Sequence, residues 1–516
     1  MKCKSPLGEH GYRRALLADS VTLRGGSLLY GLDAHHNDGP WALPEHLRQY
    51  KGVLRFRAGR EANGYSVTLM AYRNRWNATD QVPQRAVNSG GIDRFGTVDT
   101  SAGGRASRYS LSYALRQPMG QGHVGVDAYA IRSSLDLYSN FTFFLANPDD
   151  GDQFNQSERR RTMGLNARYE WQGRLARMAT QTTIGVQARH DHLDPVGLYN
   201  AAQRRRTDTV REDRVRESSV GAYLEHSIQW RPYFRSVAGL RHDRYRFNVA
   251  SSIDANSGKA RDGITSPKLS LILGPWSKSE LFFNVGRGFH SNDARGTTQT
   301  RLNDGSPSDP VTPLVPTRGA ELGMRTEIVP GLQSSLAFWR LDIDSELVFV
   351  GDAGETEPSR ASRRQGIEWN NHYIVKPWLL LDLDLAVSRA RYRDSDPVGN
   401  RVPGSLNKVG SFGVTVTDRG NWFGNLTLRY LGPRALVENN SVKSGSTALA
   451  YARVGYRFTK RLQLTLDVFN LFDRKASDID YFYASRLPGE PADGTEDIHF
   501  HPVEPRSARL TLSYAF

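Results

Sequence analysis

The sequence predicts an all-β fold, a transmembrane antiparallel β-barrel of about 21–22 strands that forms a single domain over residues 1–516. Three observations predict it. Apolar and polar residues alternate along many strand-length segments, short and long connections alternate between those segments, and the composition is polar yet rich in aromatic residues. Hydrophobic residues make up 38% of the chain, mean hydropathy is -0.54, and Tyr (22) and Phe (21) far outnumber Met (6). A barrel with a water-filled lumen has this composition because only every second residue faces lipid.

Charge and hydropathy exclude several classes of protein. No apolar run approaches the ~18 residues that a spanning helix needs, so a helical membrane protein is excluded. The net charge is +14 and 57 of the 68 basic residues are Arg. No basic run is longer than Arg204–Arg206 and no nucleic-acid motif is present, so we expect no nucleic-acid partner. Scattered Arg suits a cationic lumen or the phosphates of lipopolysaccharide at the rim. The single cysteine, Cys3, excludes an internal disulfide.

Alternation of period two indicates the strands. Counted back from Phe516, it indicates about 21 segments. Their approximate ranges are 10–18, 27–37, 49–58, 64–77, 106–117, 121–145, 153–172, 174–190, 208–230, 233–247, 262–274, 277–288, 315–329, 331–349, 359–376, 378–394, 404–418, 421–434, 447–458, 461–473 and 506–516.

The alternation also assigns a face to each side chain. Carboxylates at every second position of 378–388 cannot face hydrocarbon, so their face must be the wet lumen. The residues expected to face the lumen are Asp382, Asp384, Thr465 and Arg509. Those expected to face lipid are Leu462, Leu464, Leu466, Leu510, Leu512 and Tyr514. The last of these segments ends on an aromatic residue, Phe516.

Connections between the segments are sorted by length. Turn-like connections such as 172–174, 230–233, 274–277 and 459–461 alternate with long polar loops. The long loops are 77–105, 191–207, 289–314, 397–403 and 473–505. Short periplasmic turns opposite long extracellular loops are typical of a barrel in the bacterial outer membrane.

Closure of the barrel depends on the number of strands. An antiparallel barrel closes without a parallel pair only with an even number of strands, and 21 is odd. Met1–Glu9 could supply one more strand, but Pro6 makes this segment a poor one. We therefore expect a gap or a weak seam between the first and last strands.

Three stretches resemble the TonB-dependent receptor family. The most specific is Leu466–Asp473 (LDVFNLFD), which resembles the penultimate strand of the family and is followed by a last loop containing Asp497–Pro502 (DIHFHP). Gly286–Gly296 (GRGFHSNDARG) resembles a strand-to-loop transition, and Pro316–Gly323 (PTRGAELG) resembles the entry into the next strand. The resemblance covers residues 8–516.

The resemblance implies an outer-membrane receptor for a scarce, large nutrient, most commonly an iron–siderophore complex. In family members, loops and lumen bind the ligand and the TonB complex pulls on an N-terminal plug. The sequence shows no apolar leader after Met1, no TonB-contacting segment and no plug, so we expect a cut or mis-started N-terminus, and passive activity from the barrel alone. The alternating C-terminal strand with Leu510, Leu512, Tyr514 and Phe516 resembles the signal that the barrel-assembly machinery recognises.

Two other functions stay open. A passive porin-like channel is disfavoured because porins have 16–18 strands. A non-transporting β-rich surface protein is disfavoured by the aromatic C-terminal strand. No G-x-S-x-G elbow and no dinucleotide fingerprint appears, since Gly286–Gly288 lacks a third glycine and a following helix, so we expect no enzyme and no cofactor.

The resemblance implies that one set of residues contacts the ligand where the barrel wall meets the extracellular loops. The residues of this set are Arg287, His290, Asn292, Asp293 and Arg295. A salt-bridge network within the loop is the alternative for this set, and it is the interpretation that we favour. Tyr481 and Tyr483 could stack on a ligand, or pack within a loop or rim girdle, which we favour.

Asp497, His499 and His501 have metal-ligand spacing, but loop packing is the favoured interpretation, so no metal site is predicted. A last set, expected to form an acidic rung of the lumen paired with Arg, is Asp342, Asp344 and Glu346.

Overall fold

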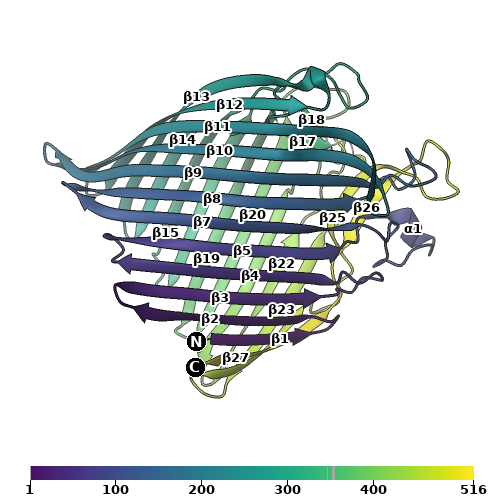
Figure 1. Cartoon of the computed structure of the whole chain (residues 1–516). Coiled ribbons are helices and arrows are strands. Elements are labelled where there is room, and N and C mark those ends of the chain that lie inside the picture. Colours follow the sequence, from purple (N-terminus) through teal and green to yellow (C-terminus); the bar gives the residue numbers. More distant parts are fainter. Residues whose placement is uncertain (1, 346, 351–354, 359) are drawn as a thin grey trace.

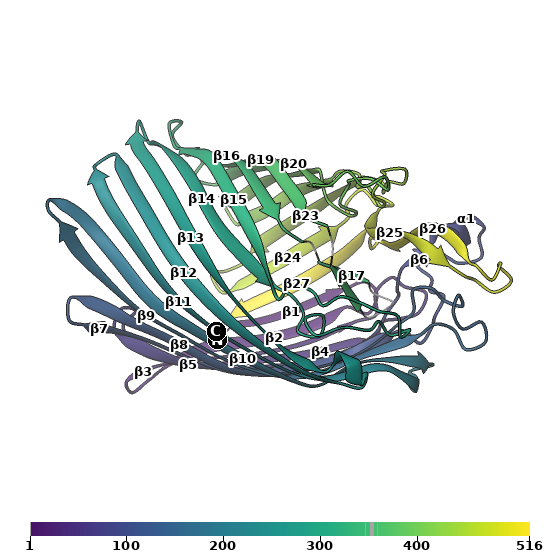
Figure 2. The same ribbon diagram turned by 90° about the horizontal axis from the view of Figure 1, so that it is seen from above.

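The computed structural model describes residues 2–345, 347–350, 355–358 and 360–516, and its main feature is one 22-stranded sheet closed into a barrel (Figures 1 and 2). Consecutive barrel strands pair antiparallel, and the last pairs with the first. The strands are β1 (Lys2–Gly8), β2 (Arg13–Leu23), β3 (Gly26–Asn37), β4 (Leu47–Gly59), β5 (Gly64–Asn77), β7 (Gly103–Met119), β8 (Gly122–Ser139), β9 (Phe154–Leu175), β10 (Met178–Ala202), β11 (Arg205–Arg231), β12 (Phe234–Ser251), β13 (Gly258–Trp276), β14 (Ser279–Ser291), β15 (Leu314–Thr326), β16 (Leu332–Ile343), β19 (Ser362–Lys376), β20 (Leu379–Tyr392), β21 (Lys408–Arg419), β22 (Trp422–Leu431), β23 (Thr447–Arg457), β24 (Leu462–Phe469) and β27 (Ser507–Ala515). The predicted fold class is confirmed, and each predicted segment overlaps one of these strands.

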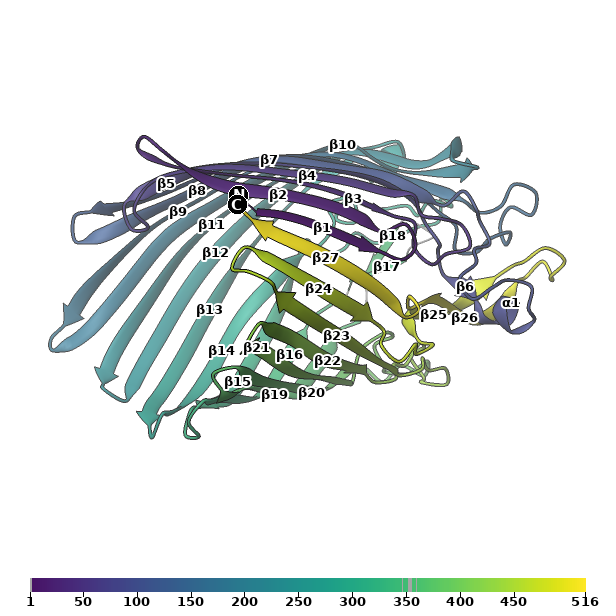
Figure 3. The same cartoon turned by 90° about the horizontal axis from the view of Figure 1, so that it is seen from below.

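The expected gap at the seam is wrong. β1 pairs with β27 over seven residues, from Lys2 opposite Ala515 to Gly8 opposite Arg509, and Figure 3 shows the two strands side by side with the termini adjacent. Pro6 is accommodated because its missing N–H affects one ladder only: the ladder to β2 skips Ser5 and Pro6, while the ladder to β27 is continuous. The even number of strands follows from this short strand.

The predicted faces are confirmed by the register and by exposure. Leu462, Leu464 and Leu466 lie opposite Tyr514, Leu512 and Leu510, so all six share one face. That face is the outside, since Leu510 is 47% and Leu512 48% exposed. On the other face, Arg509 stacks over the rings of Tyr12 and Phe469 inside the barrel, at 4.0 and 4.5 Å from their centroids.

One predicted loop is wrong. Residues 191–207 continue β10 and β11, which meet at a two-residue turn of Gln203 and Arg204. Both turn residues have positive φ, 49° and 63°, as a type I′ hairpin turn requires. The hairpin is ordered because its inward apolar side chains, among them Leu193 and Val196, are buried in a cluster with Phe247 of β12.

The long loops carry small elements of their own at one end of the barrel (Figure 1). Loop 473–505 contains β25 (Ser477–Ser485) and β26 (Thr495–Pro502), and β26 pairs with β6 (Val82–Pro83) from the loop after β5. The five-residue helix α1 (Gln84–Asn88) follows β6. The remaining elements are β17 (Leu347–Val350), β18 (Glu355–Pro358) and the 3-10 turn η1 (Asp254–Asn256). No helix in the described part of the chain is long and apolar enough to cross a membrane.

The seam can be tested with the single native cysteine. Cys3 lies directly opposite Tyr514. Opposed Cβ atoms on antiparallel strands are about 5 Å apart, close to disulfide spacing, whereas diagonal neighbours are about 7–8 Å apart. Oxidation of the refolded Tyr514→Cys variant should therefore give a disulfide between β1 and β27, measured by mass and by gel mobility after one proteolytic cut. The matched control Leu512→Cys places its thiol opposite Ser5 and should stay reduced. Equal cross-linking of both variants, or of neither, would contradict the register.

Candidate functional site

The loop after β14 contains most of the residues predicted to meet ligand. Asp293 and Arg295 pair with each other at 2.7 Å, and the Asn292 amide donates to the carbonyl of Thr312 at 2.6 Å. Burial alone would raise the pKa of Asp293, but the Arg295 guanidinium outweighs burial and lowers that pKa to about 2. Asp293 and Arg295 are therefore a charged pair that fixes the loop, and their contact with a ligand stays a prediction.

The same loop is docked inside the mouth of the barrel. Ala294 packs in the cluster formed by inward side chains of β10–β12, including Val215 and Phe247. Gln299 accepts a hydrogen bond at 2.8 Å from Arg211 of β11, which also pairs with Asp213 at 2.7 Å. The loop therefore lines the inner wall, and narrows the mouth on that side.

Arg287 lies on the outside of the barrel, contrary to the expectation that it meets ligand with the loop. It has the parity of Val285, which is 40% exposed on the outer face, and it lies opposite Arg318 of β15. His290, three residues further along β14, has the opposite parity, so its side chain faces inward; it lies opposite Val315 of β15. Alternation in the strand decides both positions.

The expectation that Asp342 belongs to an acidic rung facing the lumen is also wrong, because Asp342 faces outward. Asp342 lies opposite Arg318 on the outer face and pairs with Arg340 at 2.9 Å and Arg363 at 2.6 Å. Asp344 contacts Arg393 at 3.4 Å. Pairing with Arg was expected and is found for both, whereas Glu346 lies outside the described residues.

The sheet of β25, β26 and β6 forms a cap at the loop end, and Arg85 of α1 holds it together. The Arg85 side chain pairs with Glu490 at 2.7 Å and donates to the Ser485 carbonyl at 2.9 Å. Its backbone N–H donates to Asp497 at 2.7 Å. Nothing in the sequence signals this role, because the partners are about 400 residues away and follow no local period.

Tyr483 packs within this cap. Its ring stacks on His499 with centroids 3.8 Å apart and planes 10° from parallel. His499 is fully buried, and its Nε2 lies 2.7 Å from the Ser485 hydroxyl. Tyr481 is 45% exposed, so of the two predicted tyrosines it is the one available to a ligand.

Asp497, His499 and His501 do not converge. Asp497 accepts from Arg85, His499 contacts Ser485, and His501 lies 3.1 Å from Asp478. Within the described residues no group of three or more His, Cys, Asp or Glu could hold a metal ion. Loop packing, the favoured interpretation, accounts for all three.

The inner wall is polar and largely self-neutralised. Many inward Arg and Lys pair with carboxylates on the same strand, on the next strand or, for Lys268, on the strand beyond it, and this pairing compensates charges on a low-dielectric wall. These pairs are Arg14–Asp33, Arg116–Asp127, Arg160–Glu158, Arg189–Asp191, Arg241–Asp243, Lys268–Glu225, Arg325–Glu280 and Arg453–Asp467.

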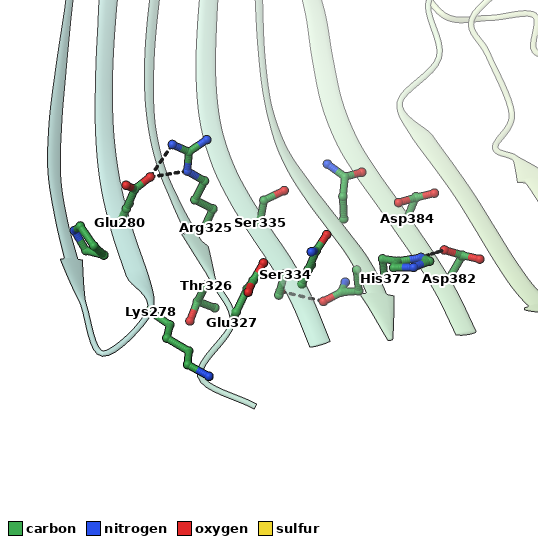
Figure 4. Close-up of a pocket in the computed structure, with 14 residues that line it drawn as sticks. Lys278, Glu280, Arg325, Thr326, Glu327, Ser334, Ser335, His372, Asp382 and Asp384 are labelled. Atoms are coloured by element: carbon green, nitrogen blue, oxygen red, sulfur yellow. Dashed lines mark hydrogen bonds and ion pairs between the residues drawn. The ribbon is translucent and has the colours of Figure 1, made fainter. Parts of the chain in front are cut away.

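Two hollows in the inner wall differ in charge. Near the turn end of β14–β20, a cavity of about 520 Å³ is lined by several acids, and Figure 4 shows Glu280 paired with Arg325 and His372 paired with Asp382, with Asp384 beside them. Nearer the middle of the wall, on β4–β10, a cavity of about 850 Å³ has an excess of basic groups, since its lining includes Arg55, Arg108, Arg160 and Arg189 against Asp127 and Glu158.

A family model described as TonB dependent receptor-like, beta-barrel, matches residues 40–471. The chain belongs to the TonB-dependent receptor family. It therefore lies in the bacterial outer membrane, with its turn end periplasmic and its loop end extracellular. The 22 strands have the size of plugged transporters rather than of porins. The similar proteins are receptors and transporters, not enzymes.

Similar proteins of known identity share the architecture. The metal-pseudopaline receptor CntO of Pseudomonas aeruginosa is 25% identical over 309 residues, which are 56% of this chain and 42% of that receptor, so the chain spans under half the length of this relative. The closed form of the ferric-catecholate import receptor Fiu from E. coli K12 superposes with a TM-score of 0.78 at 13% identity, covering 100% of this chain and 81% of that one. The ferric preacinetobactin receptor BauA from Acinetobacter baumannii gives 0.79 at 11%, covering 100% and 79%. At these identities, the solved structures show the fold alone.

The cap of this receptor should loosen in acid. Burial lowers the pKa of His499 to about 4, below its usual 6.5, so the neutral imidazole stabilises the cap above about pH 6.5 and this stability is lost as pH falls toward 4. Hydrogen exchange of residues 477–502, corrected for intrinsic rates, should therefore be faster at pH 5 than at pH 7.5.

A His499→Gln variant should lose this pH dependence, because its side chain does not titrate. His501→Gln is the matched control and should keep it, since His501 is less buried and has no contact with Ser485. Equal protection of the wild-type cap at both pH values would show that His499 does not titrate in the cap.

Proposed function

We propose that this chain forms the wall of an outer-membrane receptor that takes up an anionic metal chelate of the siderophore type. Membership of the TonB-dependent receptor family supports uptake. The names of the similar proteins support the ligand class, since they describe receptors for metal–pseudopaline, ferric catecholate and ferric preacinetobactin. We also propose that the intact receptor is energised through TonB, which rests on family membership alone.

The observation that supports an anionic ligand is the basic hollow on β4–β10. Arg55 of β4 and Arg108 of β7 both line it, and neither has an ion pair in the described residues. Thr68 and Ser110 line the wall between them and offer hydroxyl groups. Guanidinium groups without carboxylate partners attract carboxylate, catecholate or similar oxygen-rich anions, to which Arg donates two parallel hydrogen bonds.

The rest of the lumen wall would help to direct such a ligand. The acidic cavity near the periplasmic end, with Asp382 and Asp384, lies across the lumen from the part of the wall that carries Arg55 and Arg108. An anion that enters from the extracellular mouth is therefore attracted to β4–β10 and repelled from β14–β20. Tyr481 of the cap is 45% exposed and offers an aromatic surface to such a ligand.

Binding of defined ferric chelates tests the proposal. Ferric citrate and a ferric tris-catecholate should quench the tryptophan fluorescence of the refolded receptor in a saturable way. An Arg55→Gln/Arg108→Gln variant should bind at least about tenfold more weakly, because each hydrogen bond to a charged group is worth about 1.5–3 kcal/mol. The control Arg73→Gln/Arg75→Gln removes the same charge from the outer face of β5 and should bind as the wild type does. Saturable binding unaffected by either change would refute the basic hollow as the site, and no binding of any metal chelate would refute the ligand class.

A further inference from the structure

Arginines on the outer face of β8 and β9 have no partners in the protein. Arg132 of β8 and Arg159 and Arg161 of β9 are exposed and have the parity of Ala130 and Met163, which face outward. In the described residues none of the three forms an ion pair. On the same strands the inward arginines do, as Arg160 pairs with Glu158 at 2.9 Å.

The register brings these charges together. Arg132 lies directly opposite Arg161, and Arg159 lies opposite Ser134, one step nearer the extracellular end. Like charges directly opposite on neighbouring strands destabilise a sheet unless a counterion lies between them. An outward carboxylate beside them, Asp194 of β10, already pairs with Arg214 at 2.9 Å. The three guanidinium groups are therefore left for a ligand from outside the protein.

A groove on the outer face holds this cluster. It has a volume of about 750 Å³ and is lined by the three arginines together with Tyr109 and His192. Directly below it, on the periplasmic side, lie lipid-facing residues: Met163 is 60% and Leu165 45% exposed. Two residues along a strand span about 6.8 Å, so the arginines stand just above the apolar band, at the level of lipid headgroups.

The cationic row continues around one side of the barrel. Arg246 of β12 lies opposite Arg261 of β13, and Arg287 opposite Arg318, again on outward parity. On β22 and β23 the outward residues at this level are uncharged, since Tyr430 lies opposite Ala448. The groove on β7–β10 thus belongs to a basic sector of the outer surface, and it gathers three arginines that have no ion pair within the described residues.

We propose that this groove binds the phosphate groups of lipid A, the phosphorylated glycolipid of the outer leaflet. Guanidinium groups bind phosphate oxygens through two parallel hydrogen bonds, and a phosphate between Arg132 and Arg161 neutralises their repulsion. The acyl chains of the same molecule lie against the apolar band below, beside Met163 and Leu165. This proposal depends on the outer-membrane location and not on the transported ligand.

Lipid binding by the full chain tests it. Native mass spectrometry of the refolded protein would compare bisphosphorylated lipid A with dephosphorylated lipid A of the same acyl chains. Wild-type protein should retain the bisphosphorylated form in preference. The variant Arg132→Gln/Arg159→Gln/Arg161→Gln should lose at least about tenfold in affinity for it, and Arg161→Gln alone should lose part of this. The control Arg174→Gln/Arg177→Gln/Arg231→Gln makes the same charge change at the periplasmic ends of β9–β11 and should bind as the wild type does.

Three results would overturn the proposal. Wild-type protein that retains both forms of lipid A equally would show that phosphate is not recognised, and this comparison needs no variant to fold. A triple variant that binds as tightly as its control would place the lipid elsewhere. Displacement of lipid A by millimolar inorganic phosphate alone would show that the groove is a simple anion site and not a lipid site.

Discussion

The need to hydrogen-bond every backbone group that faces lipid governs this structure. Inside hydrocarbon an unpaired N–H or C=O costs several kcal/mol, so a spanning sheet must close on itself. The seven residues of β1 provide that closure, although they form one of the shortest strands of the barrel and include Pro6. The ladder to β2 tolerates the proline because the ladder to β27 is complete. A short and imperfect strand is more stable than two open edges.

The barrel wall is a single closed sheet with an inner and an outer face, and the arginines on these two faces have different surroundings. Inside, where water and carboxylates are close, many cations pair with a carboxylate of the protein, and Arg189 and Arg241 each pair with an acid two residues away on the same strand. Outside, Arg132 and Arg161 oppose each other without an acid. Some outer arginines are compensated by the protein, as Arg340 and Arg363 are by Asp342, but the charges of Arg132 and Arg161 need a counterion from outside the protein.

Local periodicity makes most of the barrel predictable, whereas features that depend on distant residues are not. The alternation at Leu462–Leu466 alone locates β24 and assigns its outward face. β1 was missed because seven residues with Pro6 are too short to show a period, although the odd count already indicated that a strand was missing. The resemblance places Arg287 where wall and loop meet ligand, and alternation with Asp344 and Glu346 suggests a lumen rung for Asp342, whereas parity with Val285 and Phe338 places both residues on the outside. The role of Arg85 could not be predicted, because its partners are remote in sequence.

The cap compensates for the short seam beneath it. It joins the loop after β5, which carries Arg85, to the loop before β27, which carries Glu490 and Asp497, and strands β27 and β1–β5 lie between these loops. Trp41, from the loop between β3 and β4, also contacts His501 of the cap, with ring centroids 4.6 Å apart. The cap is therefore fastened on both sides of the β1–β27 junction and resists its opening.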